Sequence, residues 1–117
     1  MRFMLTFFAD DAAWMALTEA EREEAIARIG AWYAEHARAG RIVEGHRLAP
    51  KTSARTVRLG PAGRGGAPLV TDGPFTETKE VIGSYAIIEV AGPDEALAVA
   101  QAWPAGGAVE VRPVMDE

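Results

Sequence analysis

Apolar and polar positions alternate with two different periods along the chain, and these periods predict strands and helices. The segment 2–8 is short, apolar and aromatic, and two aspartates follow it, which predicts a first strand. In the segment 19–39, apolar residues recur three and four positions apart, as on one face of a helix. Thr18 and Glu21 have the spacing of a capping box, and Gly40 predicts the helix end. This helix is therefore expected between Thr18 and Gly40, with a stripe of Ile26, Ile29 and Trp32 packed on a sheet.

The rest of the chain predicts more strands, a second helix and a hairpin region. Pro93 begins the second helix and Pro104 limits it. The residues 60–68, GPAGRGGAP, predict a flexible connection. The further expected strands are 42–48, 56–59, 69–71, 82–90 and 109–114. The order β-α-β, hairpin region, β-α-β is typical of an α+β ferredoxin-like sandwich, with helices on one face of an antiparallel sheet, in a single domain over residues 1–117.

Alternation within the strands predicts apolar residues on both faces of this sheet. Met4 and Phe8 point away from the other apolar residues of the first strand, and Tyr85 and Ile87 form the opposite face of the strand 82–90. Ile82, Ala86, Ile88 and Val90 are expected to share the other face of that strand. Because two helices cover only one face, we expect a second copy of the sheet to cover the other, in a homodimer.

Composition and charge exclude several classes of function. About half of the residues are apolar, a quarter are charged, and the formal net charge is -5. Nucleic-acid binding is not expected, since it usually requires a basic surface. The chain contains no cysteine, which excludes disulfides and thiolate chemistry. The apolar start is too short for a signal peptide, and no segment is long enough to span a membrane, so a cytoplasmic protein without membrane contact is expected.

The run VTDGPFTETKE at residues 70–80, followed by IGSY at 82–85, resembles the signature of the DGPF-domain proteins, a branch of the YCII-related family. The opening MRFMLTFFADD, the turn at Gly40 and the closing VEVRPVM at 109–115 fit the same family. The resemblance implies a dimeric α/β barrel, in which two ferredoxin-like sheets pack face to face with a cleft between or beside them. It also implies acid-base chemistry by a His and an Asp, as suspected for YCII relatives. A related branch eliminates chloride from a chlorinated aromatic substrate, and DGPF genes often lie beside genes for alternative sigma factors.

Two residues are candidates for catalysis. Asp72 could act as a general base or orient one, although an Asp before Gly-Pro is also a common turn former. His46 shares a face of its strand with Ile42 and Glu44, so that the imidazole and the carboxylate can approach one another. These polar groups either line a ligand cavity or lie on an exposed strand edge.

The candidates for ligand binding are Glu44, Lys79 and Tyr85. Lys79 could pair with Asp72, hold an anionic substrate, or be a solvated surface lysine; Tyr85 could point into the space between two sheets. His36 is expected to pack beside Trp32 or to be protonated near the helix end. Neither a metal site nor a cofactor is expected, because the sequence lacks zinc-ligand spacing and a phosphate-binding loop.

Two classes of function follow from these candidates. The first is a cofactor-free enzyme that uses acid-base chemistry on a small molecule in a dimer cleft. The second is a non-catalytic ligand-binding or accessory module in a sigma-factor-linked stress response. The expected partners are a second copy of the chain and a small-molecule ligand.

Overall fold

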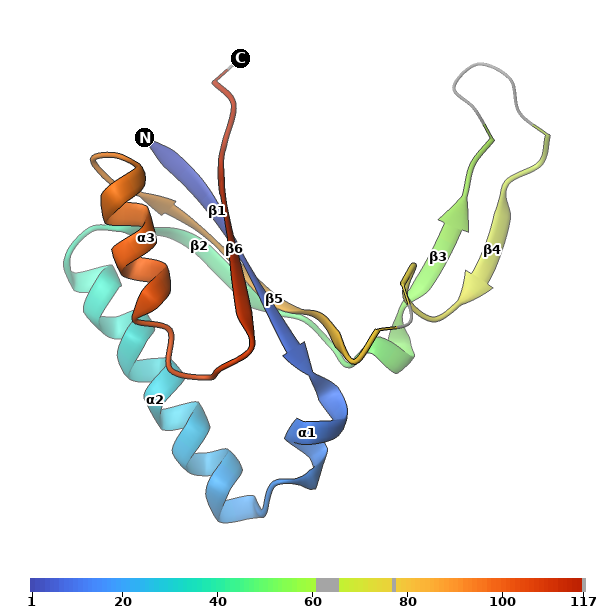
Figure 1. Cartoon of the computed structure of the whole chain (residues 1–117), viewed down its shortest axis with the longest axis horizontal. Coiled ribbons are helices and arrows are strands. Elements are labelled where there is room, and N and C mark those ends of the chain that lie inside the picture. The colour runs from blue at the N-terminus through green and yellow to red at the C-terminus, as the bar shows by residue number, and fades with distance from the viewer. Residues whose placement is uncertain (61–65, 77, 117) are drawn as a thin grey trace.

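The computed structural model describes residues 1–60, 66–76 and 78–116. Figure 1 shows a four-stranded sheet with two helices on one side and a separate hairpin projecting from it. The elements in chain order are β1 (Arg2–Asp10), α1 (Asp11–Ala16), α2 (Glu19–Arg38), β2 (Ile42–Arg47), a short 3-10 helix (Lys51–Ser53), β3 (Arg55–Arg58), β4 (Leu69–Asp72), β5 (Glu80–Glu89), α3 (Pro93–Gln101) and β6 (Ala108–Pro113). None of the helices in these ranges combines the length and the apolar character that crossing a membrane requires.

The main sheet has the strand order β2-β5-β1-β6, and every neighbouring pair is antiparallel. The helices α2 and α3 lie on one face of it. This mixed α+β architecture with antiparallel sheets is consistent with the predicted ferredoxin-like fold. The described chain does not close into a barrel, because β3 and β4 form a second sheet of their own. The expected connection 60–68 falls partly on residues 61–65, which lie outside the described residues.

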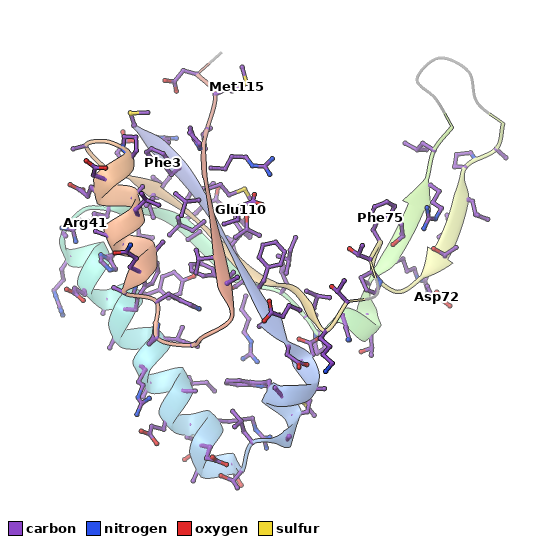
Figure 2. The ribbon with its side chains drawn as sticks, viewed as in Figure 1. Phe3, Arg41, Asp72, Phe75, Glu110 and Met115 are labelled. Atoms are coloured by element: carbon purple, nitrogen blue, oxygen red, sulfur yellow. The ribbon has the colours of Figure 1, made fainter. Side chains whose placement is uncertain are left out.

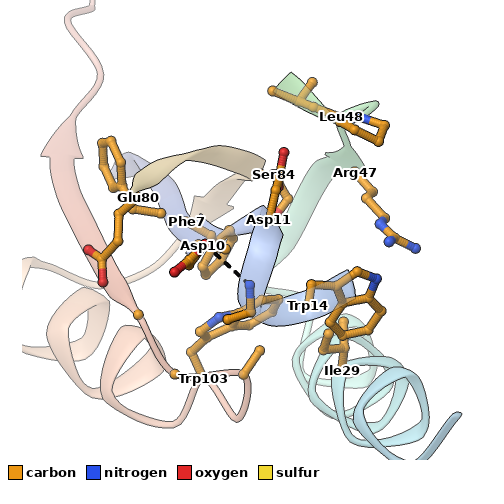
Figure 3. A pocket seen from close by; sticks show the side chains of 18 of the residues that line it. Phe7, Asp10, Asp11, Trp14, Ile29, Arg47, Leu48, Glu80, Ser84 and Trp103 are labelled. Carbon is orange, nitrogen blue, oxygen red and sulfur yellow. Dashed lines mark hydrogen bonds between the residues drawn. The ribbon is translucent and has the colours of Figure 1, made fainter. Parts of the chain in front are cut away.

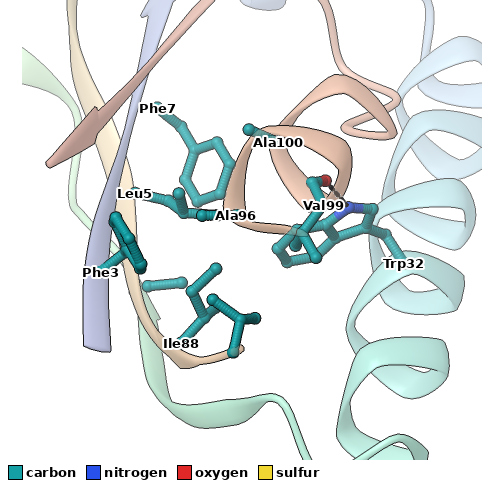
Figure 4. Packing of buried hydrophobic residues seen from close by; sticks show 10 residues of the cluster. Phe3, Leu5, Phe7, Trp32, Ile88, Ala96, Val99 and Ala100 are labelled. Carbon is teal, nitrogen blue, oxygen red and sulfur yellow. Dashed lines mark hydrogen bonds between the residues drawn. The ribbon is translucent and has the colours of Figure 1, made fainter. Parts of the chain in front are cut away.

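The hydrophobic core lies between the main sheet and the helices α2 and α3, as Figure 4 shows. Phe3, Leu5 and Ile88 are completely buried there. Trp32 reaches from α2 into this core, and its indole N–H donates to the carbonyl of Val99, 3.1 Å away. The indole therefore closes the gap between the two helices and also provides a donor for a carbonyl near the end of α3.

The helix α2 begins and ends where local sequence signals place it. The capping box is present: the Thr18 hydroxyl accepts from the Glu21 backbone N–H, and the Glu21 carboxylate accepts from the Thr18 N–H. Gly40 follows the helix with a φ of 75°, a conformation that glycine adopts at little cost. The expected stripe is buried only in part: Trp32 is in the core, but Ile26 is half exposed.

Two register shifts change which side chains share a face of the sheet. In β5, Ser84 pairs with Phe7 and Ile82 pairs with Phe8, so the intervening Gly83 has no partner in β1. This bulge puts Ile82 on the helix-free face, and the expectation that it shares a face with Ala86 is wrong. A residue left out of a strand ladder reverses the alternation beyond it.

The strand β2 contains a similar irregularity. Ile42 pairs with Ile88, but Glu44 pairs with Ile87, which leaves Val43 without a partner in β5. Since Ile88 faces the core, Ile42 faces the helices, and the expectation that it shares a face with Glu44 and His46 is wrong. The two polar residues alone belong to the helix-free face.

The helix-free face remains uncovered in the single chain and has a mixed apolar and polar surface. Phe8, Tyr85 and Ile87 are partly buried on it, and Ile82 is 48% exposed. Apolar residues on this face agree with the alternation of the sequence.

Candidate functional site

A polar cluster, defined as Glu44, His46 and Tyr85, lies on the helix-free face of β2 and β5. The Tyr85 hydroxyl donates to Glu44 Oε2 over 3.1 Å, and His46 Nε2 lies 3.6 Å from the same oxygen. The His46 and Tyr85 rings are 5.7 Å apart between centroids. His46 and Tyr85 are brought together because they are register partners in the β2–β5 ladder.

The cluster holds three groups that can exchange protons. The hydrogen bond to the Glu44 carboxylate raises the pKa of the Tyr85 hydroxyl, because ionised tyrosine would face a negative acceptor. A carboxylate that contacts both an imidazole and a phenol can orient either group for proton transfer. The side chains are well exposed, 64% for His46 and 50% for Glu44, so the single chain does not exclude water from the cluster.

Asp72 lies apart from this cluster. It is the last residue of β4, in the hairpin that projects from the main sheet (Figure 2). Its side chain is 98% exposed and forms an ion pair with Arg55, whose Nε is 3.8 Å from Asp72 Oδ1. Gly73, with a φ of 92°, then reverses the chain and donates its backbone N–H to Ala54. Within one chain, Asp72 is therefore not a partner of His46.

Lys79 is exposed just before β5. Among the described residues, no ion pair joins it to Asp72, whose carboxylate pairs with Arg55. The structure thus places four of the sequence-predicted residues at two separate locations: the polar cluster on the main sheet, and Asp72 on the hairpin.

A cleft of about 860 Å³ opens beside α1 and α2, mainly on the helix-covered side of the sheet, and His46 of the polar cluster is among the residues that line it. It lies between α1, α2, the end of the main sheet and the turn that precedes β6, as Figure 3 shows. Its walls are mostly apolar and include the rings of Phe7, Trp14, Tyr33 and Trp103. Phe7 is buried and stacks on Trp103 with their ring centroids 3.9 Å apart, which fixes the Trp103 ring against the core.

Two of the three acidic residues that line the cleft, Asp10 and Asp11, have backbone partners. Asp10 caps α1, because its Oδ1 accepts from the N–H groups of Ala12 and Ala13. Asp11 Oδ2 accepts from the backbone N–H of Lys51 over 2.8 Å, which ties α1 to the segment that leaves β2. These carboxylates therefore hold the cleft wall in place, and the aromatic surface is what a ligand would contact.

One cationic group and one phenol complete the cleft. The Arg47 guanidinium lies over the Trp14 ring, 5.2 Å from its centroid, a cation–π arrangement that positions both side chains. Tyr33 is half-buried, and burial raises the pKa of its hydroxyl. A Cβ at Gly45 would come within 2.8 Å of the Tyr33 ring, so a larger residue at this position would force the ring to shift.

This cleft was not predicted from the sequence. The helix α1 was not expected, and neither Trp14 nor Trp103 was named as a candidate residue. The lining residues extend from Phe7 to Gly107. The available signal in the sequence was Trp14 after the first expected strand and Trp103 at the end of the second expected helix. These two residues are far apart in the chain, so the sequence alone does not indicate that they line one cleft.

His36 belongs to the core rather than to a site. Its ring is buried 4.8 Å from Trp32 between centroids, and its Nδ1 lies 3.0 Å from the Arg41 guanidinium. Burial lowers the pKa of His36, since the charged imidazolium would lose its hydration. Packing beside Trp32, one of the two expected explanations, is thus observed, and the neutral ring is favoured over the protonated one.

No group of three or more His, Cys, Asp or Glu residues is placed to hold a metal ion in the described ranges 1–60, 66–76 and 78–116. The polar cluster holds one imidazole and one carboxylate.

Comparison with known proteins identifies relatives over the whole length. The model of the YCII-related domain matches residues 1–117. The chain is also similar to an uncharacterized protein of Rhizobium meliloti (strain 1021), with 33% identity over 118 residues, which cover 97% of this chain and 92% of the relative. Both matches include the cleft, the polar cluster and the projecting hairpin.

Proposed function

The chain belongs to the YCII-related family, and on that premise we propose that it binds a small, largely apolar molecule in the cleft beside α1 and α2. The cleft itself supports this proposal, because it has a volume of about 860 Å³ and aromatic rings line it. Ligand sites typically have about 300–1,000 Å³, apolar walls and a few polar groups.

The lining favours a neutral molecule with one or two rings. The partly exposed rings of Trp14, Tyr33 and Trp103 line the cleft, and aromatic rings bind flat apolar rings by offset or edge contacts. Asp10 and Asp11 lie at the same cleft and disfavour an anionic ligand. An uncharged ring system therefore fits the cleft better than a carboxylate or phosphate compound.

The test uses the neutral fluorescent probe N-phenyl-1-naphthylamine. We expect saturable fluorescence enhancement, with energy transfer from tryptophan, because Trp14 and Trp103 line the cleft. Ala13→Phe, which puts a ring into the cleft from α1, should weaken binding about tenfold or more. Ala98→Phe is the matched control, because Ala98 is an exposed helical alanine outside the cleft. Equal binding by both variants would disprove the proposal.

A second candidate function is cofactor-free acid-base chemistry at the polar cluster, enclosed by a second copy of the chain. The hydrogen bond of Tyr85 to Glu44, with His46 beside the same carboxylate, favours it. The exposed apolar residues of the helix-free face support a homodimer that buries this face and shields the cluster from water. Proton transfer by a positioned side chain typically contributes about 10²–10⁴ in rate.

Two measurements test this candidate. Light scattering at micromolar concentration should give twice the mass of one chain, and a monomer mass would refute the dimer. Exchange of the α-hydrogens of cyclohexanone in D₂O, followed by NMR, should be faster with the protein than without it. Tyr85→Phe should reduce that acceleration, whereas Leu97→Ala, at an exposed position of α3 outside both the cluster and the cleft, should not. No acceleration with this ketone, or an equal effect of both variants, would count against acid-base chemistry at the cluster.

A further inference from the structure

The hairpin β3–β4, which we call the arm, lacks the support that a small sheet requires. In the part of the chain that the structure describes, its two strands pair only with each other. An isolated two-stranded hairpin is marginally stable in water, and its outer edges present unpaired backbone groups. The arm also makes the molecule unusually extended: the radius of gyration is 16.6 Å, compared with about 13 Å for a compact chain of this length.

One face of the arm combines apolar and charged side chains. Val57 and Val70 are register partners, and they are 55% and 57% exposed. Alternation along the strands puts the partners Arg55 and Asp72 on the same face. Any surface that covers the two valines therefore also contacts the ion pair between Arg55 and Asp72.

We propose that the arm docks through this face on the helix-free face of a second copy, and that each copy thereby contributes Asp72 to the polar cluster of its partner. The inference rests on the proposed dimer. The helix-free face offers apolar side chains to the valines, since Ile82 and Met4 are exposed on it.

Charge complementarity selects the second copy as the occupant of the arm. The arm presents a guanidinium and a carboxylate in Arg55 and Asp72, and the cluster presents a carboxylate in Glu44 and an imidazole in His46 that can donate a hydrogen bond. Docking would bring the Arg55 guanidinium of one copy to the Glu44 carboxylate of the other, and the Asp72 carboxylate to the His46 imidazole. Complementary potentials of this kind set the register of an interface.

The docked arm would change the chemistry that the cluster can perform. In one chain, His46 has a single carboxylate beside it and both side chains are solvated. A second carboxylate from the partner would orient the imidazole from its other side, and the arm would exclude water. The His–Asp pair that the single chain does not form would then be assembled between two copies.

The experiment uses the absence of native cysteine, which makes introduced thiols unique. Asp72→Cys and His46→Cys are purified separately, one of them labelled with ¹⁵N, mixed to exchange subunits and treated with a short bis-maleimide. The mass of the covalent product identifies a cross-link between two different chains. Asp94→Cys, an exposed aspartate on α3, replaces Asp72→Cys in the control mixture. We expect about tenfold more mixed product from the arm variant than from the control.

The outcomes separate the arm from the dimer itself. A dimer by light scattering that gives no more cross-link than the Asp94→Cys control would overturn the arm docking and leave the proposed dimer intact. A monomer would overturn both. As a second measurement, Val57→Glu should weaken dimerisation about tenfold because it places an unpaired charge in the interface, whereas Leu97→Glu on α3 should not. Equal dimerisation of these two variants would also overturn the inference.

Discussion

Replacing Trp32 by phenylalanine tests the central packing of the fold. The indole is 3% exposed, and its N–H is the donor to the Val99 carbonyl near the end of α3. In a continued helix that carbonyl would accept from the Trp103 N–H, but this N–H bonds to Ala100 instead. Phenylalanine keeps an aromatic ring in the core and removes the donor, so the Val99 carbonyl loses its partner in a buried position.

The expected loss has two parts. An unsatisfied buried acceptor costs about 1–3 kcal/mol. The smaller ring also buries less apolar surface, and the equivalent of two methylenes adds about 1.5 kcal/mol. Trp32→Phe should therefore lower the free energy of unfolding by about 2.5–4.5 kcal/mol, a large share of the stability of a domain of this size.

Trp103→Phe is the matched control for this measurement. Trp103 is partly exposed, stacks on Phe7, and has no side-chain hydrogen bond among the described residues. Its replacement should cost less than about 1.5 kcal/mol, because only packing is lost. Urea unfolding followed by far-ultraviolet circular dichroism, at one protein concentration, measures both variants without relying on tryptophan emission. A loss below about 0.5 kcal/mol for Trp32→Phe, or equal losses for the two variants, would refute the reasoning.

Three further predictions concern pH, backbone conformation and the arm. Burial lowers the pKa of His36 below 6.5 in the folded protein, so the unfolded chain binds the extra proton and the free energy of unfolding should fall as the pH drops below about 6.5. Urea midpoints at pH 7.5 and 5.5 measure this dependence of stability on pH, and His36→Gln should reduce it. Gly107→Ala should destabilise the protein by more than Gly40→Ala in thermal unfolding: both glycines have positive φ, but only at Gly107 would a Cβ lie 2.1 Å from the Phe8 carbonyl oxygen. Asp72→Asn should change stability by less than about 1 kcal/mol in urea unfolding, because the ion pair is exposed; a larger loss would mean that the charge holds the arm.

Candidate residues could be identified from the sequence more easily than their arrangement. Glu44 and His46 were predicted to approach one another because they are two positions apart in a strand, and they do. Tyr85 joins them through strand pairing, which depends on register rather than on local sequence. Asp72 was also a reasonable candidate, but its position follows from β4 pairing with β3 instead of with the main sheet.

The sequence by itself determined the elements whose signals are local. The helix α2 follows from the capping box at Thr18 and the glycine at Gly40, since both act within a few residues of the helix ends. The strands follow from short apolar runs, and the family follows from a continuous motif. Each of these depends on neighbours in the chain, so no knowledge of distant contacts is required.

Only the tertiary structure decided which side chains meet. The bulges at Val43 and Gly83 reverse the alternation of two strands, so that Ile42 and Ile82 exchange faces relative to the simple pattern. The cleft joins residues from Phe7 to Gly107, and the strands of the arm pair with each other in a sheet separate from the main one. These features depend on pairing between residues far apart in the sequence, where a shift of one position changes every contact beyond it.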